Sequence, residues 1–410
     1  MNATYKVIQA LKEKLDNDKE LREALLLSLK LAKANAGNGS LEPKLFDALR
    51  WPLTVQEYIS YLDFYAKWIP NQYGDAWRTP DGYNQNQEVY DRLCHFHWLV
   101  NQELYGNGVV LFQAVQSGEW FREWMTSYAR LWGEFLDTPE SFNENTLNSF
   151  REFAPQYHIE DSMIVDPHTG RLIPNSPSGW QTFNQFFARD LNPGLRPVAE
   201  PYTNSTIVSP ADCTFKKIYP INEHSQIDEI TVKQTHKFAS IADLLEGSPH
   251  KDDFANGTFV HYFLGPSDYH RFHAPVSGQV LESRAVLGNV YLNVVINPET
   301  NQFDAPDDAE DGYEFVQTRG ILMLDTTNSP FGNLGKVAVI PVGMSQVSSV
   351  NMIAKEGTTL LKGDEFGFFL FGGSDIIMLF QADINLSLND SPVHHNYGTT
   401  VGSCFLIPKN

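Results

Sequence analysis

The run Phe368-Phe369-Leu370-Phe371-Gly372-Gly373-Ser374-Asp375-Ile376-Ile377 sets two glycines and a serine between two apolar, strand-like segments near the C-terminus. Glycine opens backbone conformations that are closed to other residues. A serine hydroxyl at such a bend can reach the preceding carbonyl group, so the tripeptide Gly372-Gly373-Ser374 is a candidate site of self-cleavage. Taken alone, the tripeptide is explained more simply as a Gly-rich bend between strands.

Size and charge limit the classes of protein to which the chain can belong. Its 410 residues are enough for about two to three domains, and 42% of them are hydrophobic. A formal net charge of -20 argues against binding to nucleic acid or to anionic lipid surfaces. No stretch approaches the roughly 18 to 20 apolar residues of a transmembrane helix, and the N-terminus lacks the apolar core of a signal peptide. The sequence therefore predicts a cytoplasmic protein with no nucleic-acid partner and no integral membrane association.

The first part of the chain has helical signals. Asn17 and Glu20 have the spacing of a capping box ahead of the apolar run 21–34, and Gly37 is a plausible stop. Thr54 and Glu57 repeat this spacing before a second apolar stripe, which ends by Pro70. A third, aromatic stripe runs from Trp120 to Phe135, and such stripes are usually core or interface. We predict a helical domain over residues 1–155.

Beyond residue 155 the sequence becomes turn-rich and then strand-like. A short amphipathic piece spans 180–191, and we expect the second domain to cover residues 156–410. Its strand-like runs are 206–209, 258–264, 290–296, 313–325, 336–342, 346–353 and 365–380. The predicted class is thus α+β, with a helical N-terminal domain followed by a mostly β domain.

Cysteine and histidine spacing gives little support for a metal. Cys94, Cys213 and Cys404 are scattered, so we expect reduced thiols and no disulfide framework. His270 and His273 are three residues apart, a spacing that suits metal ligation, but no cysteine or carboxylate set completes the site. The sequence predicts no metal.

Two further motifs carry polar groups next to predicted turns. The segment 186–197, FFARDLNPGLRP, holds Arg189 and Arg196, which can cap the carbonyls of a helix or bind a carboxylate; capping is the favoured interpretation. Asp212 ends the run 209–212, SPAD, and an isolated aspartate in a turn usually bonds the local backbone.

A serine, a histidine and an aspartate together imply more than any of them alone. Serine is a weak nucleophile until a base removes its proton, and a neutral histidine is such a base. The combination indicates either a hydrolase or self-processing. Ser374 lacks the Gly-x-Ser-x-Gly motif of α/β-hydrolases, which makes a serine hydrolase the weaker alternative.

The motifs occur in a characteristic order: FFARDLNPGLRP (186–197), SPAD (209–212), YHRFH (269–273) and FGGS (371–374). In this order, over roughly residues 180–410, the sequence resembles the phosphatidylserine decarboxylase family of pyruvoyl enzymes, and the resemblance implies a mostly antiparallel β decarboxylase domain. The helical N-terminal region resembles that of the soluble branch, which decarboxylates free aromatic amino acids such as L-tryptophan.

The resemblance implies how the chain processes itself. Ser374 attacks the carbonyl of Gly373, with His273 as the base and Asp212 orienting that base. Cleavage leaves a β-chain of residues 1–373 and an α-chain of residues 374–410, which stay associated. Ser374 becomes a pyruvoyl group, so the chain makes its own cofactor and needs neither a metal nor pyridoxal phosphate.

The resemblance also implies roles in turnover. The pyruvoyl ketone forms a Schiff base with the substrate amine, and His270 protonates the carbanion left by carbon dioxide. Tyr269 and Phe272 are candidates for lining the substrate pocket, with ordinary core packing as the alternative. The sequence departs from the family pattern at Asp375, where threonine is frequent, and at Cys213, where glycine is usual; Cys213 is interpreted as a packing substitute.

We therefore predict a soluble, pyruvoyl-dependent decarboxylase that converts a free L-amino acid, aromatic and tryptophan-like, to the amine and carbon dioxide. The first alternative is a phosphatidylserine decarboxylase that makes phosphatidylethanolamine, with the amphipathic stretch 21–34 lying on a bilayer. An alternative of another class is a non-catalytic binding module on the same fold.

Overall fold

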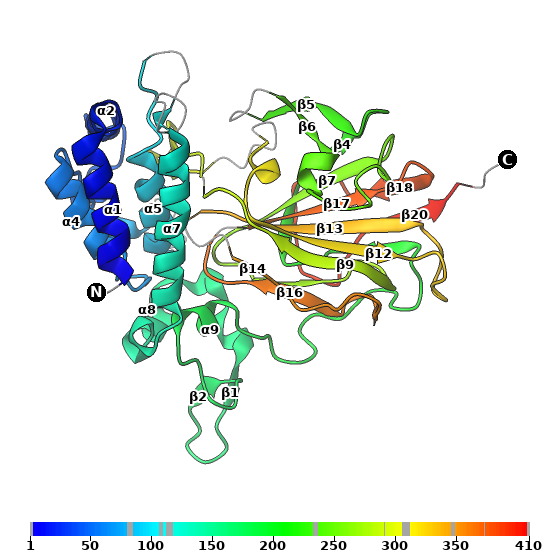
Figure 1. Cartoon of the computed structure of the whole chain (residues 1–410). Helices are drawn as coiled ribbons and strands as arrows, with labels where there is room; N and C mark the ends of the chain where they lie inside the picture. Colours follow the sequence, from blue (N-terminus) through cyan, green and yellow to red (C-terminus); the bar gives the residue numbers. More distant parts are fainter. Residues whose placement is uncertain are drawn as a thin grey trace.

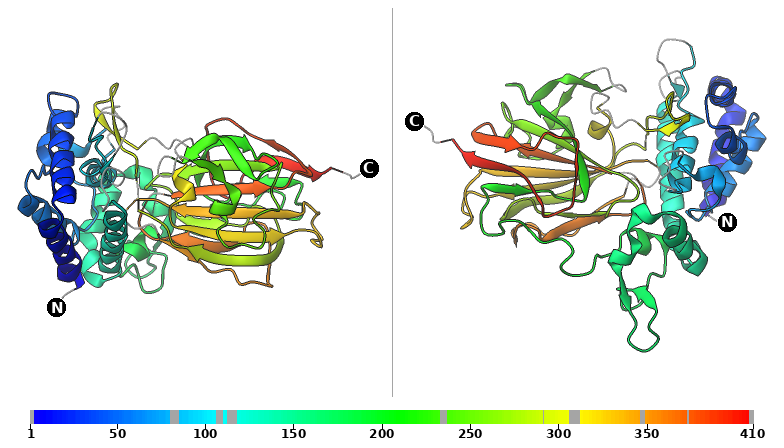
Figure 2. Two further views of the ribbon diagram at one scale, coloured as in Figure 1. Left: turned by 45° about the horizontal axis from the view of Figure 1, so that its top comes forward. Right: turned by 180° about the vertical axis from the view of Figure 1, so that it is seen from behind.

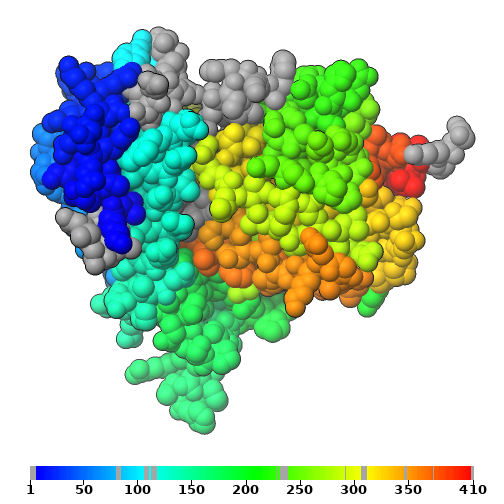
Figure 3. Space-filling view, viewed as in Figure 1, coloured from blue at the N-terminus to red at the C-terminus, as the bar shows by residue number. Residues whose placement is uncertain are grey.

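The computed structural model describes residues 3–79, 85–105, 110–111, 118–232, 237–290, 292–305, 312–345, 349–372 and 374–407. A helical region and a β region lie side by side, and the views from several directions agree on this arrangement (Figures 1 and 2). In the space-filling view their surfaces meet along a continuous boundary (Figure 3). The predicted α+β class, with helices first and strands after them, is confirmed. No helix in the described ranges has the length and apolar content needed to cross a membrane.

Nearly all helical residues precede residue 154. The α-helices are α1 (Ala3–Asn17), α2 (Lys19–Ala36), α3 (Pro43–Ala48), α4 (Val55–Tyr65), α5 (Glu88–Trp98), α7 (Gly118–Leu136), α8 (Glu144–Phe153), α9 (Phe183–Phe187) and α10 (Ile241–Leu244).

Helix ends follow local capping chemistry. Thr54 and Glu57 form the predicted capping box at the start of α4. The cap of α2 is Asp18, whose carboxylate accepts a hydrogen bond from the amide of Leu21 at 3.0 Å, so the predicted cap at Asn17 is wrong by one residue. α1 extends through Asn17, which leaves Asp18 as the first residue free to cap. Gly37 ends α2 as predicted.

The helices share one hydrophobic core. α2 turns Leu21, Leu25 and Leu29 into it, all fully buried, so its apolar face is occupied inside the protein. The expectation that this stretch could lie on a bilayer is therefore wrong for the folded chain. The aromatic stripe of α7 is likewise core, as predicted, with Tyr128 and Trp132 fully buried.

The β region consists of short strands. They are β1 (Met163–Val165), β2 (Leu172–Pro174), β3 (Thr206–Val208), β4 (Cys213–Pro220), β5 (Gln226–Val232), β6 (Lys237–Ser240), β7 (Thr258–Leu264), β8 (Arg271–His273), β9 (Gly278–Val286), β10 (Val295–Asn297), β11 (Gln302–Asp304), β12 (Arg319–Asp325), β13 (Lys336–Gly343), β14 (Val350–Met352), β15 (Thr359–Leu360), β16 (Glu365–Phe369), β17 (Ser374–Phe380), β18 (Ile384–Leu388), β19 (His394–His395) and β20 (Thr400–Leu406).

An antiparallel sheet of eight strands forms the centre of the β region, in the order β15-β9-β12-β13-β17-β7-β4-β19. β17 lies in the middle of it, between β13 and β7. Alternation along β17 sends Ile376 and Met378 to one core and Ile377 and Leu379 to the other. Two three-stranded sheets, β14-β16-β8 and β18-β20-β3, contribute to the core that contains Ile376. Every residue of β17 is buried because both faces are covered.

Several predicted strand boundaries need correction. The run 258–264 coincides with β7, whereas 365–380 is two strands, β16 and β17, separated by the glycine bend. The run 313–325 begins with a 3-10 turn and becomes β12 only at Arg319. Residues 346–348 of the run 346–353 lie outside the described residues, and β14 begins at Val350.

The two predicted domains share side-chain packing. Phe183, Phe187 and Phe371 belong to the same core as the N-terminal helices. A small hairpin, β1 with β2, projects from the body between α8 and α9 (Figures 1 and 2). The boundary near residue 155 stays a prediction, and the segment that precedes the glycine bend packs on the helical side.

Candidate active site

Ser374 is the first residue of the central strand β17 and is fully buried. Its backbone lies opposite Gly343 of β13 and Leu264 of β7. Gly372 has a φ of 157°, close to the extended limit. Gly373, the other predicted residue of the cleavage site, lies outside the described residues.

His270 is the histidine that contacts the serine. Its Nδ1 lies 3.3 Å from Ser374 Oγ, and its Nε2 lies 3.3 Å from the carbonyl oxygen of Pro266. A carbonyl can only accept, so Nε2 carries the proton and Nδ1 presents its lone pair to the serine hydroxyl. Phe187 stacks on the imidazole with 4.0 Å between ring centroids.

Burial keeps the His270 ring neutral. The side chain is fully buried, and removal from water lowers the pKa of His270 to about 3. The positive charge of Arg189 lowers that pKa further, whereas the Pro266 carbonyl raises it. At neutral pH this imidazole is therefore unprotonated beside a hydroxyl, so its Nδ1 can accept the hydroxyl proton.

His273 is the last residue of β8, three residues after His270, and it has other partners. Its Nδ1 donates to the Gly363 carbonyl at 2.9 Å, and its Nε2 lies 3.3 Å from the hydroxyl of Tyr269. The ring of Tyr397 stacks on it at 3.8 Å. Burial lowers the pKa of His273 to about 4, while the nearby Asp212 carboxylate raises it. The contacts of His273 are therefore with groups other than Ser374.

Asp212 is held by an arginine. Arg196 Nη2 donates to Asp212 Oδ2 at 2.6 Å and its Nε contacts both carboxylate oxygens, while the amide of Tyr397 donates to Oδ1 at 2.7 Å. The backbone amide of His273 bonds the Pro210 carbonyl, which places the aspartate loop beside that histidine. Asp212 therefore acts on His273 in this structure through its charge, while the hydrogen bonds of both side chains go to other groups.

The arginines of this motif do not cap α9, contrary to the favoured interpretation. Arg196 binds a carboxylate, and Arg189 donates to the Tyr157 carbonyl at 2.6 Å. The carbonyl of Ala188, at the end of α9, is bonded instead by Arg271 at 2.9 Å.

The residues predicted to line a pocket have different surroundings. Phe272 is fully buried and packs on Phe366 and Phe369 in the sheet core, which matches the packing alternative. Tyr269 places its hydroxyl on His273, and burial raises the pKa of that phenol. Cys213 is buried 3.2 Å from the hydroxyl of Ser209, and burial raises the pKa of its thiol, which fits a packing residue.

Asp375 extends the site to the other face of the sheet. The hydroxyl of Tyr313 donates to its Oδ2 at 2.7 Å, and Nε2 of His261 lies 3.5 Å from its Oδ1. The carboxylate and the imidazole are both fully buried. Because side chains alternate along a strand, this cluster lies on the side of β17 opposite the hydroxyl of Ser374.

Asn184 joins the helical region to the bend. Its side-chain oxygen accepts the amide of Phe371 at 3.3 Å, and its Nδ2 donates to Asp137 at 2.9 Å and to the carbonyl of Gly133. The ring of Phe371 meets Trp132 edge to face at 5.4 Å. The chain that leads to the cleavage site is thus positioned by α7 and α9.

Sequence reasoning missed Asn184, Tyr397 and the Tyr313–Asp375 pair. None of them has a local signal, because each acquires its role from a partner at least 60 residues away in the chain. Arg196 was named in advance with carboxylate binding as its less favoured role, and its pairing with Asp212 was not predicted. Within the described residues, no group of three or more histidine, cysteine, aspartate or glutamate side chains is placed to hold a metal ion.

Comparison with known proteins gives the family. The sequence profile of phosphatidylserine decarboxylase matches residues 183–403. A protein of Fusobacterium nucleatum subsp. nucleatum, named phosphatidylserine decarboxylase proenzyme, is 31% identical over 274 residues, which cover 67% of this chain and 77% of that protein. A protein of Oryza sativa subsp. japonica, named phosphatidylserine decarboxylase proenzyme 2, is 35% identical over 253 residues, 61% of this chain and 35% of the relative. This chain therefore spans only about a third of the rice protein.

A third relative carries a different name. The Amanita muscaria protein named decarboxylase iboD is 28% identical over 271 residues, which cover 61% of this chain and 73% of that protein. All three relatives are named decarboxylases, which agrees with the predicted carboxy-lyase class, whereas none of these three names supports a free aromatic amino acid as substrate. With a profile match over half its length and an extensive alignment to the Fusobacterium proenzyme, the chain belongs to the phosphatidylserine decarboxylase family.

Proposed function

We propose that this protein is a pyruvoyl-dependent decarboxylase that cleaves itself between Gly373 and Ser374. The observation that carries the proposal is the contact of 3.3 Å between Ser374 Oγ and the unprotonated Nδ1 of His270, inside a site closed to water. A neutral imidazole there can take the hydroxyl proton while the oxygen attacks the neighbouring carbonyl. Family membership supports the same chemistry.

Processing follows as a balanced sequence. The hydroxyl of Ser374 loses its proton to His270, its oxygen bonds to the carbonyl carbon of Gly373, and the peptide C–N bond breaks as the nitrogen gains a proton. Residue 374 then loses its α-proton, and the bond between its Cβ and the ester oxygen breaks. This elimination releases the Gly373 carboxylate. Water replaces the nitrogen, ammonia leaves, and residue 374 becomes the pyruvoyl group that begins the α-chain.

The surroundings of Ser374 fit this group. It is small, and Nδ1 of His270, whose ring is held by the stacked Phe187, lies beside residue 374 in position to exchange a proton. A pyruvoyl group supplies an electrophilic ketone that accepts the amine of the substrate and the electron pair left by carbon dioxide. His270 then has the position to return a proton to the product, as predicted for turnover.

The family resemblance and the contacts in the structure point to different histidines as the base for cleavage. The resemblance assigns it to His273, oriented by Asp212, whereas the contacts favour His270. We propose His270 as the base and the Arg196–Asp212 pair as the support that holds the loop of His273 in place. Replacing each histidine in turn separates the two assignments.

Phosphatidylserine is the first candidate substrate, because the Fusobacterium and rice relatives are named for it. A free amino acid is the second candidate. Two observations favour it: Ser374 is buried where the helical region packs against the bend, and the Amanita relative bears a name without phosphatidylserine. Aromatic specificity and a cytoplasmic location stay predictions.

The deciding experiment has two parts. Intact mass and a denaturing gel of the purified protein should show chains of residues 1–373 and 374–410, and Ser374→Ala should remain a single inactive chain. Carbon dioxide release is then measured with phosphatidylserine, serine, tryptophan and other amino acids, alongside liposome flotation. A single full-length chain in an active preparation would falsify the processing step. Activity in the Ser374→Ala variant would exclude the pyruvoyl assignment.

Two alternatives are tested by the same material. A non-catalytic binding module would stay uncleaved and release no carbon dioxide from any substrate. A serine hydrolase would keep Ser374 as serine and would react with a fluorophosphonate probe, whereas a pyruvoyl enzyme has no serine left to label.

A further inference from the structure

The segment that joins β18 to β20, residues 389–399, crosses from its own hairpin to the surroundings of the cleavage site. We call it the C-terminal strap. Within it, β19 pairs with the start of β4 at the edge of the central sheet. The amide of Tyr397 donates to Asp212 Oδ1 at 2.7 Å. The amide of Gly398 donates to the carbonyl of Ser209 at 3.0 Å. The strap, which follows the proposed cleavage site, is thus docked on the aspartate loop that precedes it.

A tight turn between β7 and β8, residues 265–268, holds the ring of His270. It begins directly after β7, whose last residue pairs with Ser374. Inside the turn, the amide of Gly265 donates to Asp268 Oδ2 at 2.8 Å. The carbonyl of Pro266 accepts Nε2 of His270 at 3.3 Å, which leaves Nδ1 to face the serine. The orientation of this turn therefore controls whether the base points at the hydroxyl.

One side chain of the strap contacts this turn. Nε2 of His394 lies 3.0 Å from Asp268 Oδ1, and it is the donor because a carboxylate only accepts. Within the described residues, the other hydrogen bond of the Asp268 side chain stays inside the turn. The bond to His394 is therefore the one that ties this carboxylate to a separate element. The side chain of His394 is 44% exposed and that of Asp268 is 20% exposed, so water screens the pair and its contribution is modest.

The charges around His394 support this pairing. The hydrogen bond to Asp268 raises the pKa of His394, whereas burial lowers it. The carboxylate of Asp212 raises that pKa further, and the guanidinium of Arg196 lowers it. A neutral imidazole still donates from Nε2, so the contact persists when His394 loses its charge.

We propose that His394 is a positioning residue for self-cleavage, which holds the turn 265–268 and through it the ring of His270. This role rests on the proposed self-cleavage and adds a control to the same site. Each non-covalent step from the strap to the hydroxyl of Ser374 spans 3.3 Å or less. A mobile turn would let the ring of His270 rotate away from the hydroxyl, and the bond from the strap opposes that motion.

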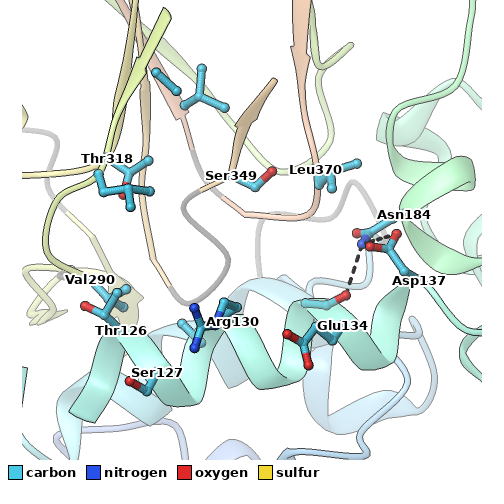
Figure 4. A pocket seen from close by; sticks show the side chains of 15 residues that line it. Thr126, Ser127, Arg130, Glu134, Asp137, Asn184, Val290, Thr318, Ser349 and Leu370 are labelled. Atoms are coloured by element: carbon cyan, nitrogen blue, oxygen red, sulfur yellow. Dashed lines mark hydrogen bonds between the residues drawn. The ribbon is translucent and has the colours of Figure 1, made fainter. Parts of the chain in front are cut away.

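The two groups that must meet for cleavage are then held from opposite ends of the chain. Asn184 bonds the amide that precedes the bend, and Figure 4 shows its other bond, to Asp137 of α7. The base is held from the other side by the strap. Because His394 lies beyond Ser374 in the sequence, the base is fully oriented only after the chain that follows the cleavage site has folded. Self-cleavage of an incompletely folded chain is thereby disfavoured.

The first test measures self-cleavage at one pH, in timed samples from cell-free translation. We expect His394→Ala to slow cleavage about three- to tenfold, as for the loss of one partly exposed hydrogen bond to a charged group. His394→Gln keeps an amide donor near the position of Nε2 and should recover most of the rate. His224→Ala is the matched control, because His224 also faces a carboxylate, that of Glu223 at 3.6 Å, in the exposed turn between β4 and β5. It should cleave like the wild type.

A double variant tests the route from the strap to the base. Asp268→Ala removes the carboxylate that His394 reaches, so adding His394→Ala to it should slow cleavage no further. Effects of the two changes that multiply would refute the route through Asp268. A wild-type rate in His394→Ala would refute the role of His394. An equal loss in His394→Gln, or in the His224→Ala control, would also refute it.

A spectroscopic measurement separates this role from the proposed function. In the full-length Ser374→Ala chain, the nitrogen NMR resonances of the His270 ring show which nitrogen carries the proton, and their loss in His270→Asn identifies them. We expect a proton on Nε2, and the further change His394→Ala should increase the form protonated on Nδ1. Unchanged His270 resonances would refute the positioning role. A wild type that stays uncleaved would instead contradict the proposed function, and the resonances would still test the contact between the strap and the turn.

Discussion

His270→Asn should abolish self-cleavage on the time scale of the wild type. Asparagine has a similar shape and retains hydrogen-bonding groups, but it cannot take a proton from Ser374 near neutral pH. Loss of a positioned general base typically lowers a rate by about 10²- to 10⁴-fold. His273→Asn removes bonds to the Gly363 carbonyl and the Tyr269 hydroxyl, neither of which touches the serine. We expect it to slow cleavage by about tenfold or less, as for one or two misplaced hydrogen bonds.

The pH dependence of cleavage tests a separate point, namely that the base is a buried histidine, whether His270 or His273. Burial lowers the pKa of His270 to about 3, so its ring stays neutral as the pH falls from about 7.5 to 5.5. The cleavage rate should therefore be flat across this interval. A base with the ordinary histidine pKa of about 6.5 would lose roughly 90% of its active form by pH 5.5.

Timed samples from cell-free translation, adjusted to each pH and then denatured, provide the assay. The disappearance of the 410-residue chain and the appearance of the 1–373 chain are followed by gel and intact mass. A cleaved His270→Asn protein together with an uncleaved His273→Asn protein would refute this reasoning and return the base to His273. A rate that follows a pKa near 6.5 would contradict the argument from burial.

Three further predictions concern residues around the site and in the helical core. Asn184→Ala should slow cleavage up to about tenfold, without loss of fold by circular dichroism, because it releases the backbone amide before the bend; an unchanged rate would contradict this positioning role. Tyr313→Phe should lower the free energy of unfolding in urea by about 1 to 3 kcal/mol, because the buried Asp375 carboxylate loses the hydroxyl that donates to it. Tyr58→Phe is the control and should change that free energy very little, because the buried Tyr58 hydroxyl has no hydrogen-bond partner in the described residues. Equal losses in the two variants would contradict the role given to the Tyr313 hydroxyl. Burial lowers the pKa of His95 to about 3, below its unfolded value of about 6.5. The contribution of neutral His95 to the free energy of unfolding is therefore complete above pH 6.5 and declines by about 1.4 kcal/mol per pH unit as the pH falls toward 3. His95→Gln should remove this slope, and urea stability curves that stay parallel for the two proteins would show that His95 titrates normally.

Local signals in the sequence predicted the helices well. The capping box at Thr54 lies within four consecutive residues, and the aromatic residues of α7 recur at helical spacing within one segment, so neither pattern needs tertiary information. The error at Asn17 arose because two good capping residues are adjacent and only the end of α1 decides between them.

Prediction of the strands and of the contacts in the site was limited, because both depend on partners far apart in the sequence. β9 was missed because Glu282 and Arg284 interrupt its apolar alternation, and its assignment rests on pairing with β12 and β15. The motifs located His270, His273, Asp212 and Ser374, but the sequence holds no information on which histidine ring turns toward the hydroxyl. That choice is made by the Pro266 carbonyl and the Phe187 ring, which fix the orientation of His270.

The buried position of Ser374 links processing to substrate access. In the uncleaved chain, residue 374 is fully buried and Phe371 is packed against Phe183, Phe187 and Trp132. A substrate amine can reach a ketone at this position only after the covering chain has shifted. Cleavage makes that shift possible, because it frees the chain that follows β16, where Phe371 is packed on the helical region while Phe368 and Phe369 stay paired in the sheet. The helices therefore influence both self-cleavage and substrate turnover. They position the bend for the attack of Ser374, and their packing on Phe371 limits how far the new chain end can move away from the ketone.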